Sequence, residues 1–218
     1  MRKKQLTRAR PRSLPSGVST TTNALDPGPS EAHVYADSEA ALDCLVRRTS
    51  PHHLILWGRS LGSAPTIHLA RLLLARGVPL AGVVLQSPLV SVLRVGLSAS
   101  LWTALVDPAS DIFPNLARVR DGGLGCPVFV IHGQADYIVS CAHGEEIYES
   151  VPDEHKFPPL FVAGAGHNDV DEVLGRQGSS ILFHVRKFVN FCCTQADPAL
   201  PPVRDVYVLS AADAPTQV

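Results

Sequence analysis

Four short runs of apolar residues are continuous rather than alternating, which is typical of strands buried on both faces of a parallel sheet. These runs are residues 53–58, 82–86, 127–132 and 159–163. Helix-prone segments follow most of the runs, at residues 61–75, 141–149 and 179–191. Alternation of strands and helices predicts an α/β fold, in which a parallel sheet of about four to five strands is flanked by helices through right-handed crossovers.

The pattern changes at both ends of the chain and once within it. Residues 1–29 are rich in Arg, Lys and Pro and contain a single acid, so we expect a disordered basic tail. A capped amphipathic helix is predicted from Ser30, and the globular domain is predicted to span residues 30–193. Residues 89–124 form a less regular insert, and residues 194–218 are predicted to be a loose tail.

Composition excludes several classes of protein. The chain has 218 residues, is 45% hydrophobic and 18% charged, and has a formal net charge of −1, which is the balance of a soluble globular domain. So much apolar surface excludes a wholly disordered chain. No apolar run approaches the length of a spanning helix, and the near-neutral charge gives no reason to expect nucleic acid as a partner.

The five cysteines are odd in number and include no C-x-x-C pair, which predicts reduced thiols packed in a cytoplasmic protein. No Cys or His pair has ligand spacing, so we expect no metal and no other cofactor. The basic tail would allow weak peripheral contact with anionic membranes. A mitochondrial transit peptide is the less favoured interpretation of that tail, because the apolar stripe of such a helix is nearly absent.

The element Gly58-Arg59-Ser60-Leu61-Gly62 lies between the first predicted strand and its helix, which is the context of a nucleophile elbow. The tight turn requires small residues two positions away from the serine, which Gly58 and Gly62 provide. We predict that Ser60 is a nucleophile and that the backbone N–H of Leu61 is an oxyanion donor. The alternative is a glycine-rich turn whose serine caps the helix.

A serine nucleophile needs a base and an acid that orients the base. Ligands of an open parallel sheet bind beyond the carboxyl ends of its strands. Asp136 follows the third predicted strand, and His167 follows the fourth. The order Ser60, Asp136, His167 is that of the α/β-hydrolases, so we predict Asp136 as the acid and His167 as the base.

Other residues compete for these roles. His132 also ends a predicted strand, but we expect it to pack beside Gly133 rather than to act as the base. Asp111 is an alternative acid if the insert folds over the site. The remaining polar candidates are expected to be structural or solvated: His52, His53 and His68 on surfaces, His184 on the last helix, Asp169 as a supporting partner or helix cap, and Arg59 in solvent.

Segments between residues 29 and 192 share motifs with one group of enzymes. They are Pro29-Ser30-Glu31, Tyr35-Ala36-Asp37, Leu54 to Gly62, Gln86-Ser87-Pro88-Leu89, Leu93-Arg94-Val95, Asp111 to Asn115, Val130 to Gly133 with Asp136, and Gly164 to Asp169. In these segments the chain resembles the α/β-hydrolase-fold serine hydrolases, and more narrowly the alpha/beta-hydrolase-domain 17 group of protein depalmitoylases. The Ser-Pro-Leu and Phe-Pro-Asn segments are the motifs more specific to that group.

The resemblance implies thioester hydrolysis, in which Ser60 attacks an acyl-cysteine carbonyl, His167 shuttles the proton and Asp136 fixes its tautomer. The substrate would be an acylated protein or a lipid-like ester. The insert 89–124 would cover the acyl chain, although a helix packed on the sheet is its simpler interpretation. Its apolar residues are Leu97, Leu101, Trp102, Leu105 and Val106. Esterases, lipases and peptidases share this triad and remain alternatives.

Two features of the group have no counterpart in this sequence. One is the Cys-rich segment that anchors those enzymes to membranes. The other is the set of strands before the nucleophile, with the loop that donates a second oxyanion N–H, because residues 1–29 contain no apolar run. We therefore expect an N-terminally shortened, incomplete α/β-hydrolase fold, with turnover lower by about 10²–10³-fold. Its first strand would be an open sheet edge, so association through that edge by an inactive protein is an alternative function.

Overall fold

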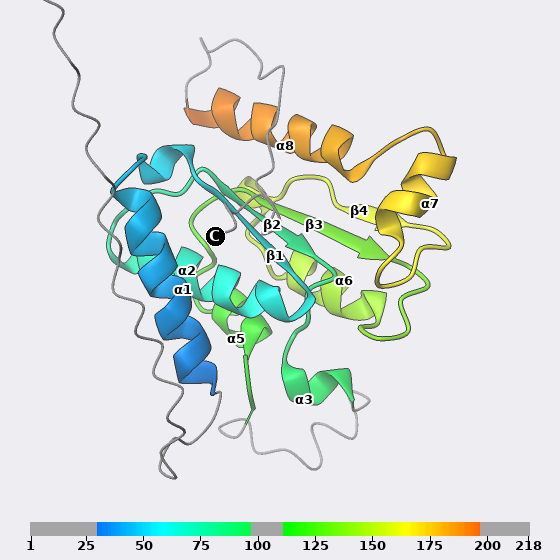
Figure 1. The fold of residues 1–218 in the computed structure, drawn as a ribbon, viewed down its shortest axis with the longest axis horizontal. Coiled ribbons are helices and arrows are strands. Elements are labelled where there is room, and N and C mark those ends of the chain that lie inside the picture. Colours follow the sequence, from blue (N-terminus) through cyan, green and yellow to red (C-terminus); the bar gives the residue numbers. More distant parts are fainter. Residues whose placement is uncertain (1–29, 97–110, 197–218) are drawn as a thin grey trace, which may run out of the picture. The chain divides into compact units, whose positions relative to one another are not determined.

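A computed structural model describes residues 30–96 and 111–196 of the chain. Within them lies one parallel sheet with the strand order β1-β2-β3-β4, which confirms the predicted architecture (Figure 1). The strands are β1 (Ile55–Arg59), β2 (Gly82–Gln86), β3 (Val128–Gly133) and β4 (Leu160–Val162). Because all four run in the same direction, the segments that follow them meet at one edge of the sheet.

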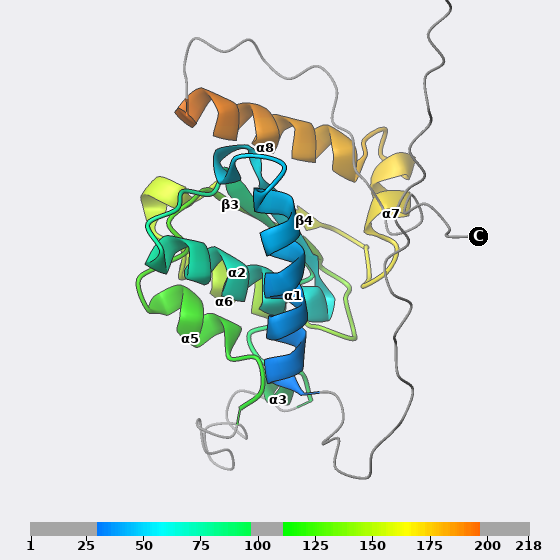
Figure 2. The same ribbon diagram turned by 60° about the vertical axis from the view of Figure 1, so that its left-hand side comes forward.

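Helices connect the strands and cover both faces of the sheet (Figures 1 and 2). They are α1 (Glu31–Val46), α2 (Ser63–Ala75), α3 (Val92–Val95), α5 (Asn115–Arg120), α6 (Cys141–Glu149), α7 (Val170–Arg176) and α8 (Ile181–Ala196). Short 3-10 turns are η1 (Pro51–His53), η2 (Ser60–Gly62) and η4 (Asp153–His155). Helices α2, α5 and α6 pack on one face, and α7 and α8 pack on the other.

Burial differs between the central and the outer strands. Every residue of β3 is buried, and so is every residue of β2 except Gln86. In contrast, most residues of β1 and β4 are only partly buried. Both faces of the outer strands are nevertheless covered, as predicted: Leu56 and Phe161 pack against one core cluster, and Ile55, Trp57 and Leu160 pack against the other. The lower burial of β1 and β4 goes with their single neighbouring strand among the described residues.

The apolar pattern located most elements but not their ends. Helix α2 begins at Ser63, after the turn η2, and α8 continues to Ala196, three residues beyond the predicted domain boundary. Helix α7 was not predicted, because its seven residues are too few to show a clear apolar period. Of the insert, the structure describes α3 and α5. The tails 1–29 and 197–218 lie outside the described residues, as do Leu97, Leu101, Trp102, Leu105 and Val106.

Helix α1 is joined to the insert through one carboxylate. Glu31 accepts hydrogen bonds from the hydroxyl of Tyr35 at 2.6 Å, the backbone N–H of Phe113 at 3.1 Å and the guanidinium of Arg118 at 3.0 Å. Phe113 is buried at a φ of 53°, a strained conformation for a non-glycine residue. The bond from Glu31 to its N–H helps to hold that turn, and Tyr35 packs against its ring.

All five cysteines are free thiols, as predicted. Cys126, Cys141 and Cys192 are buried, and burial raises the pKa of their thiols to about 12, about 11 and about 12 respectively. Thiols held neutral in this way are poor nucleophiles.

None of the described helices is both long and apolar enough to cross a membrane.

The aromatic cluster under α8 provides a test of the fold. Phe188 is fully buried, with its ring centroid 5.6 Å from that of Phe129 and 5.2 Å from that of Phe157. Phe188→Ala should lower the free energy of unfolding by about 3–5 kcal/mol, measured by urea denaturation. Phe183→Ala on the same helix should change it by less than about 0.5 kcal/mol, because Phe183 is 49% exposed. Equal losses for the two variants would contradict this packing of α8.

Candidate active site

Ser60 follows β1 directly and has a φ of 51°, the strained conformation expected of a nucleophile elbow. A side chain at Gly58 would collide with the carbonyl oxygen of Gly62 and the hydroxyl of Thr66, so only glycine fits there. Gly62 has open space around its Cβ position and an ordinary negative φ. The requirement for a small residue therefore holds at Gly58 and was wrong for Gly62.

A buried polar network supports the elbow from behind. The hydroxyl of Ser63 donates to the carbonyl of Ser60 at 2.7 Å and accepts from the amide of Asn115 at 3.3 Å. The same amide donates to the carbonyl of Leu89 at 2.9 Å. Asn115 is fully buried, so both ends of the insert are fixed against the elbow. Sequence analysis did not single out Ser63 or Asn115 as site residues, although Asn115 belongs to the Phe-Pro-Asn motif.

Asp136 lies in the loop after β3, and its carboxylate is shielded from solvent. Its Oδ1 accepts hydrogen bonds from the backbone N–H groups of Ile138 and Val139, both at 2.9 Å. Its Oδ2 lies 2.7 Å from Nδ1 of His167. A buried carboxylate is stable only with such partners, so the turn that surrounds Asp136 is built to hold it.

His167 lies in the loop after β4, with 8% of its surface exposed. Its Nδ1 donates to Asp136, which leaves Nε2 free to accept a proton. The loop is closed by Asp169, whose Oδ1 accepts from the N–H of Gly166 at 2.6 Å. Asp169 therefore supports the loop of the histidine, one of the two roles expected for it, although it also stands at the start of α7 without a side-chain cap.

Arg59 connects the elbow to the histidine loop. Its guanidinium donates to the backbone carbonyl of His167 at 3.2 Å and to Oδ1 of Asn168 at 2.5 Å. The expectation that Arg59 is merely solvated was therefore wrong. Within the part of the chain that the structure describes, no hydrogen bond joins the hydroxyl of Ser60 to His167; the two residues are linked through Arg59. Hydrogen bonds of this kind are often long before substrate binds.

Large apolar side chains are exposed beside both predicted catalytic segments. Leu61, next to Ser60, is 50% exposed, and Tyr137 and Ile138, next to Asp136, are 88% and 43% exposed. Leu61 lies in the first turn after the elbow, where backbone N–H groups have no partner within the helix. The predicted oxyanion donor therefore lies at a position from which its N–H can bind an acceptor.

The competing residues have other partners. Asp111 lines a separate cavity with Val90, Arg94 and Arg120, whereas Asp136 contacts His167. His132 is buried in the sheet, where its Nε2 donates to the carbonyl of Val139. The remaining histidines behave as structural or surface groups: His52 and His53 are exposed, His68 pairs with Glu39, and His184 contacts the hydroxyl of Ser179.

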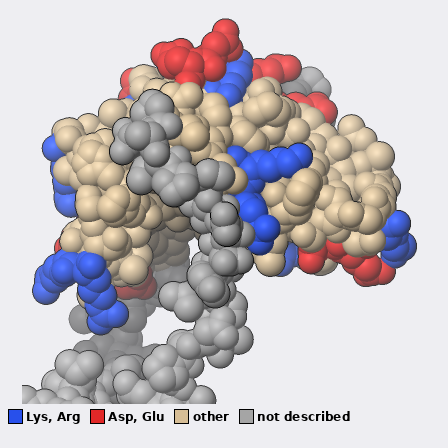
Figure 3. Space-filling model, turned by 90° about the horizontal axis from the view of Figure 1, so that it is seen from above, with Lys and Arg blue, Asp and Glu red and all other residues tan. Residues whose placement is uncertain are grey.

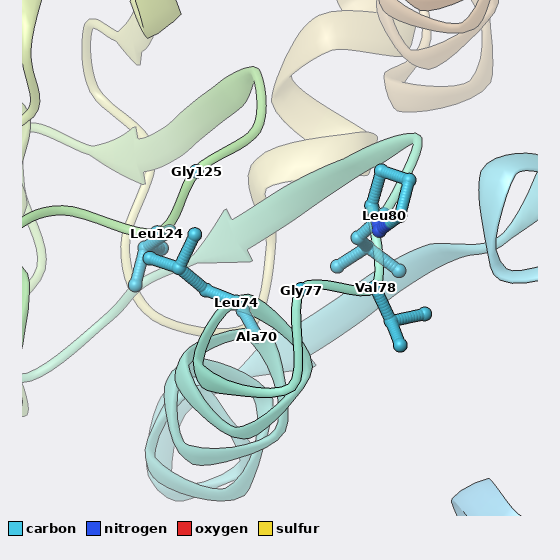
Figure 4. A pocket seen from close by; sticks show the side chains of 8 residues that line it. Ala70, Leu74, Gly77, Val78, Leu80, Leu124 and Gly125 are labelled. Carbon is cyan, nitrogen blue, oxygen red and sulfur yellow. The ribbon is translucent and has the colours of Figure 1, made fainter.

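A cavity of about 270 Å³ lies at the amino ends of β2 and β3, away from the carboxyl ends where the candidate site lies (Figure 4). It is lined by Ala70, Leu74, Gly77, Val78, Leu80, Leu124 and Gly125, which precede β2 and β3 or end α2. Ser60, Asp136 and His167 follow the carboxyl ends of their strands. This cavity is therefore unconnected with the candidate site.

Surface charge and possible metal ligands can be followed in the described part of the chain. On the face shown in Figure 3, acidic and basic side chains are interspersed on a mostly uncharged surface, unlike the single-sign surface typical of nucleic-acid-binding proteins. Among residues 30–96 and 111–196, no group of three or more His, Cys, Asp or Glu side chains is placed to hold a metal ion.

No family model matches the chain. Several proteins are similar to it over 145 residues, or 66% of its length. The alpha/beta hydrolase domain-containing protein 17C of Mus musculus is 39% identical, the protein aho-3 of Caenorhabditis elegans is 38% identical, and the 17B protein of Xenopus laevis is 37% identical. The matched regions cover 41%, 40% and 46% of those proteins, so the chain spans less than half the length of these relatives.

Solved structures agree on the fold. The monoacylglycerol lipase of Paleococcus ferrophilus is 20% identical with a TM-score of 0.50, and the match covers 76% of each chain. A soluble variant of the monoglyceride lipase of Saccharomyces cerevisiae is 15% identical with a TM-score of 0.51, covering 76% of this chain and 71% of the lipase. The protein is thus an α/β hydrolase by fold. It is homologous to the alpha/beta hydrolase domain-containing 17 proteins, as its motifs indicated.

The two elbow glycines provide a matched test of the local geometry. Gly58→Ala should lower the free energy of unfolding by about 1–3 kcal/mol, because its methyl group collides with Gly62 and Thr66. Gly62→Ala should be close to neutral, because nothing lies near its Cβ position. Urea denaturation of both variants measures the difference. If Gly62→Ala is the more damaging of the two, the structure of this turn is incorrect.

Proposed function

We propose that the protein is a serine hydrolase that cleaves acyl thioesters, with acylated proteins as its substrates. The observation that carries the proposal is the 2.7 Å contact between Asp136 and His167. Their loops follow the adjacent strands β3 and β4, and Ser60 lies in a strained turn after β1, at the same ends of the strands. The homology to the alpha/beta hydrolase domain-containing 17 proteins supports a hydrolase, the broader class to which this reaction belongs.

In the proposed reaction, Ser60 Oγ attacks the thioester carbonyl carbon and transfers its proton to Nε2 of His167. Asp136 holds Nδ1 of the imidazolium that forms. The backbone N–H of Leu61 donates to the tetrahedral oxyanion. The thiol then leaves with the proton from His167, and a water molecule, activated by the same imidazole, hydrolyses the acyl-enzyme to a free fatty acid.

The surface beside the site suits an apolar acyl group. Leu61, Tyr137 and Ile138 are exposed and adjoin the predicted nucleophile and acid. An acyl chain that contacts them would remove their apolar surface from water, which stabilises the complex. Thioesters also have a better leaving group than amides, so a site with few oxyanion donors is better matched to them.

Labelling with a fluorophosphonate probe tests the nucleophile. The folded protein should form a covalent adduct at Ser60, located by mass spectrometry of peptides, and Ser60→Ala should abolish it. His167→Ala should slow labelling by at least about 100-fold, because the serine then lacks its base. His53→Ala is the matched control, since His53 is exposed and lies before β1, at the opposite end of that strand from Ser60.

Hydrolysis of a palmitoyl thioester, a monoglyceride and a peptide amide by the same samples distinguishes the substrate classes. We expect the highest kcat/KM for the thioester and loss of activity in Ser60→Ala. A higher kcat/KM for the monoglyceride or the peptide would overturn the proposed substrate class, and the protein would still be a serine hydrolase. If the folded protein shows neither labelling nor hydrolysis, the proposal that it is a serine hydrolase is wrong.

One observation favours a second candidate function, association with a second copy through β1. This strand has a single partner, β2, among the described residues, so the backbone groups on its other edge are free to pair. A groove of about 330 Å³ runs beside that edge, and its lining is mostly apolar, including Leu42, Leu45 and Trp57. Two copies of one edge are self-complementary about a two-fold axis.

Light scattering over a range of concentrations tests this association. The protein should approach the mass of a dimer at high concentration, and Leu45→Lys should weaken the dimer at least about tenfold by placing a charge in the covered groove. Leu74→Lys is the control, because Leu74 is similarly exposed but lines the separate cavity before β2 and β3 and not this groove. A monomer at every concentration would refute the association.

A further inference from the structure

We propose that His132 is a positioning residue, which holds the Asp136 carboxylate in the orientation that His167 requires. This inference deepens the proposed function and rests on it. His132 is fully buried near the end of β3, four residues before Asp136. It lies behind the contact between Asp136 and His167 and would touch no substrate.

The contacts of His132 converge on the turn that contains Asp136. Its Nε2 donates to the carbonyl of Val139 at 2.9 Å and lies 3.3 Å from Oδ2 of Asp136. Val139 in turn donates its N–H to Oδ1 of Asp136. The imidazole therefore fixes the far end of the turn and borders the same carboxylate oxygen that contacts His167.

These contacts determine the tautomer of His132. The carbonyl of Val139 and the carboxylate of Asp136 are acceptors, so the proton lies on Nε2. Nδ1 is buried and has no hydrogen-bond partner within the described part of the chain. It faces the backbone of Gly144 in α6, where an added Cβ would lie 2.5 Å from it. The ring is thus locked between α6 and the Asp136 turn.

The unpartnered nitrogen argues for a role beyond packing. A buried polar atom without a partner costs stability, and an apolar residue of similar size would fill this place without that cost. The benefit that remains is the bond from Nε2–H to the Asp136 turn. Such support matters at a catalytic pair, because small displacements of the orienting acid weaken the base.

Burial also keeps His132 neutral, which suits this role. Desolvation lowers the pKa of His132 below its ordinary value of 6.5, against the opposing effect of Asp136. The other titratable groups near it are His167 and His143 on α6, and burial also lowers the pKa of His143. In the unfolded chain His132 binds a proton more readily than in the folded protein. The stability that the buried, neutral imidazole of His132 provides is therefore complete above about pH 6.5 and is lost as the pH falls.

Two substitutions at position 132 separate positioning from packing. His132→Leu keeps an apolar side chain of comparable size and removes the donor, whereas His132→Gln keeps an N–H near the position of Nε2. We expect His132→Leu to lower kcat for thioester hydrolysis by about 10- to 100-fold with KM changed less than about threefold. His132→Gln should recover most of that loss. His53→Leu, at an exposed position, is the control and should have no effect.

A second measurement is independent of activity. In ¹⁵N-histidine NMR spectra, the Nδ1 proton of His167 should be protected from exchange in the original protein and in His132→Gln, and exposed in His132→Leu. Gly144→Ala should reduce the same protection by displacing the ring of His132, while Gly175→Ala, a helical glycine with open space at its Cβ position, should not. The glycine pair decides the question if His132→Leu does not fold.

The outcomes separate the two proposals. If the protein hydrolyses no substrate but the Nδ1 proton responds as expected, the proposed function fails and the positioning role remains. If folded His132→Leu keeps full kcat and a protected Nδ1 proton, His132 is a packing residue and the inference is overturned. An equal loss of kcat in His132→Leu and His132→Gln would also overturn it, because the N–H donor that glutamine retains would then not support the Asp136 turn.

Discussion

The carboxylate of Asp136 is the group on which the arrangement of the site depends. It is shielded from water, and such a group is stable only when its oxygens are hydrogen-bonded. Its partners come from two loops: the backbone of the turn after β3, and His167 after β4. Satisfying this one carboxylate therefore fixes the relative position of two loops that are distant in sequence. His167 is oriented by the same bond that stabilises the acid.

A second carboxylate, that of Glu31, has a similar effect on the other side of the elbow. It joins α1 to the turn at Phe113 and to Arg118 of α5. Asn115 continues this connection to Ser63 and from there to the carbonyl of Ser60. The segments that resemble the alpha/beta hydrolase domain-containing 17 proteins are thus in contact with one another, although they are scattered along the sequence. In this chain these motifs form a network of polar contacts that supports the turn at Ser60.

Sequence analysis predicted the sheet well because central strands show a strong signal. Continuous apolar runs located β2 and β3, whose residues are nearly all buried. It did not show that β1 and β4 are less buried, since an apolar run indicates that the faces of a strand are covered but not how many strands lie beside it. It missed α7 and the short helices of the insert, because a helix of four to seven residues spans too few turns to show a period.

The sequence by itself determined the order of the elements and the placement of Ser60, Asp136 and His167 after three strands of a parallel sheet. Both follow from local patterns: apolar runs, glycine spacing and the rule that ligands bind beyond strand carboxyl ends. Only the tertiary structure decided which polar atoms meet. It placed Arg59 on the loop of His167, Ser63 on Asn115, and His132 beside Asp136. The first two pairs join segments that are 108 and 52 residues apart, and the third depends on how the turn after β3 folds, so no local sequence pattern shows these contacts.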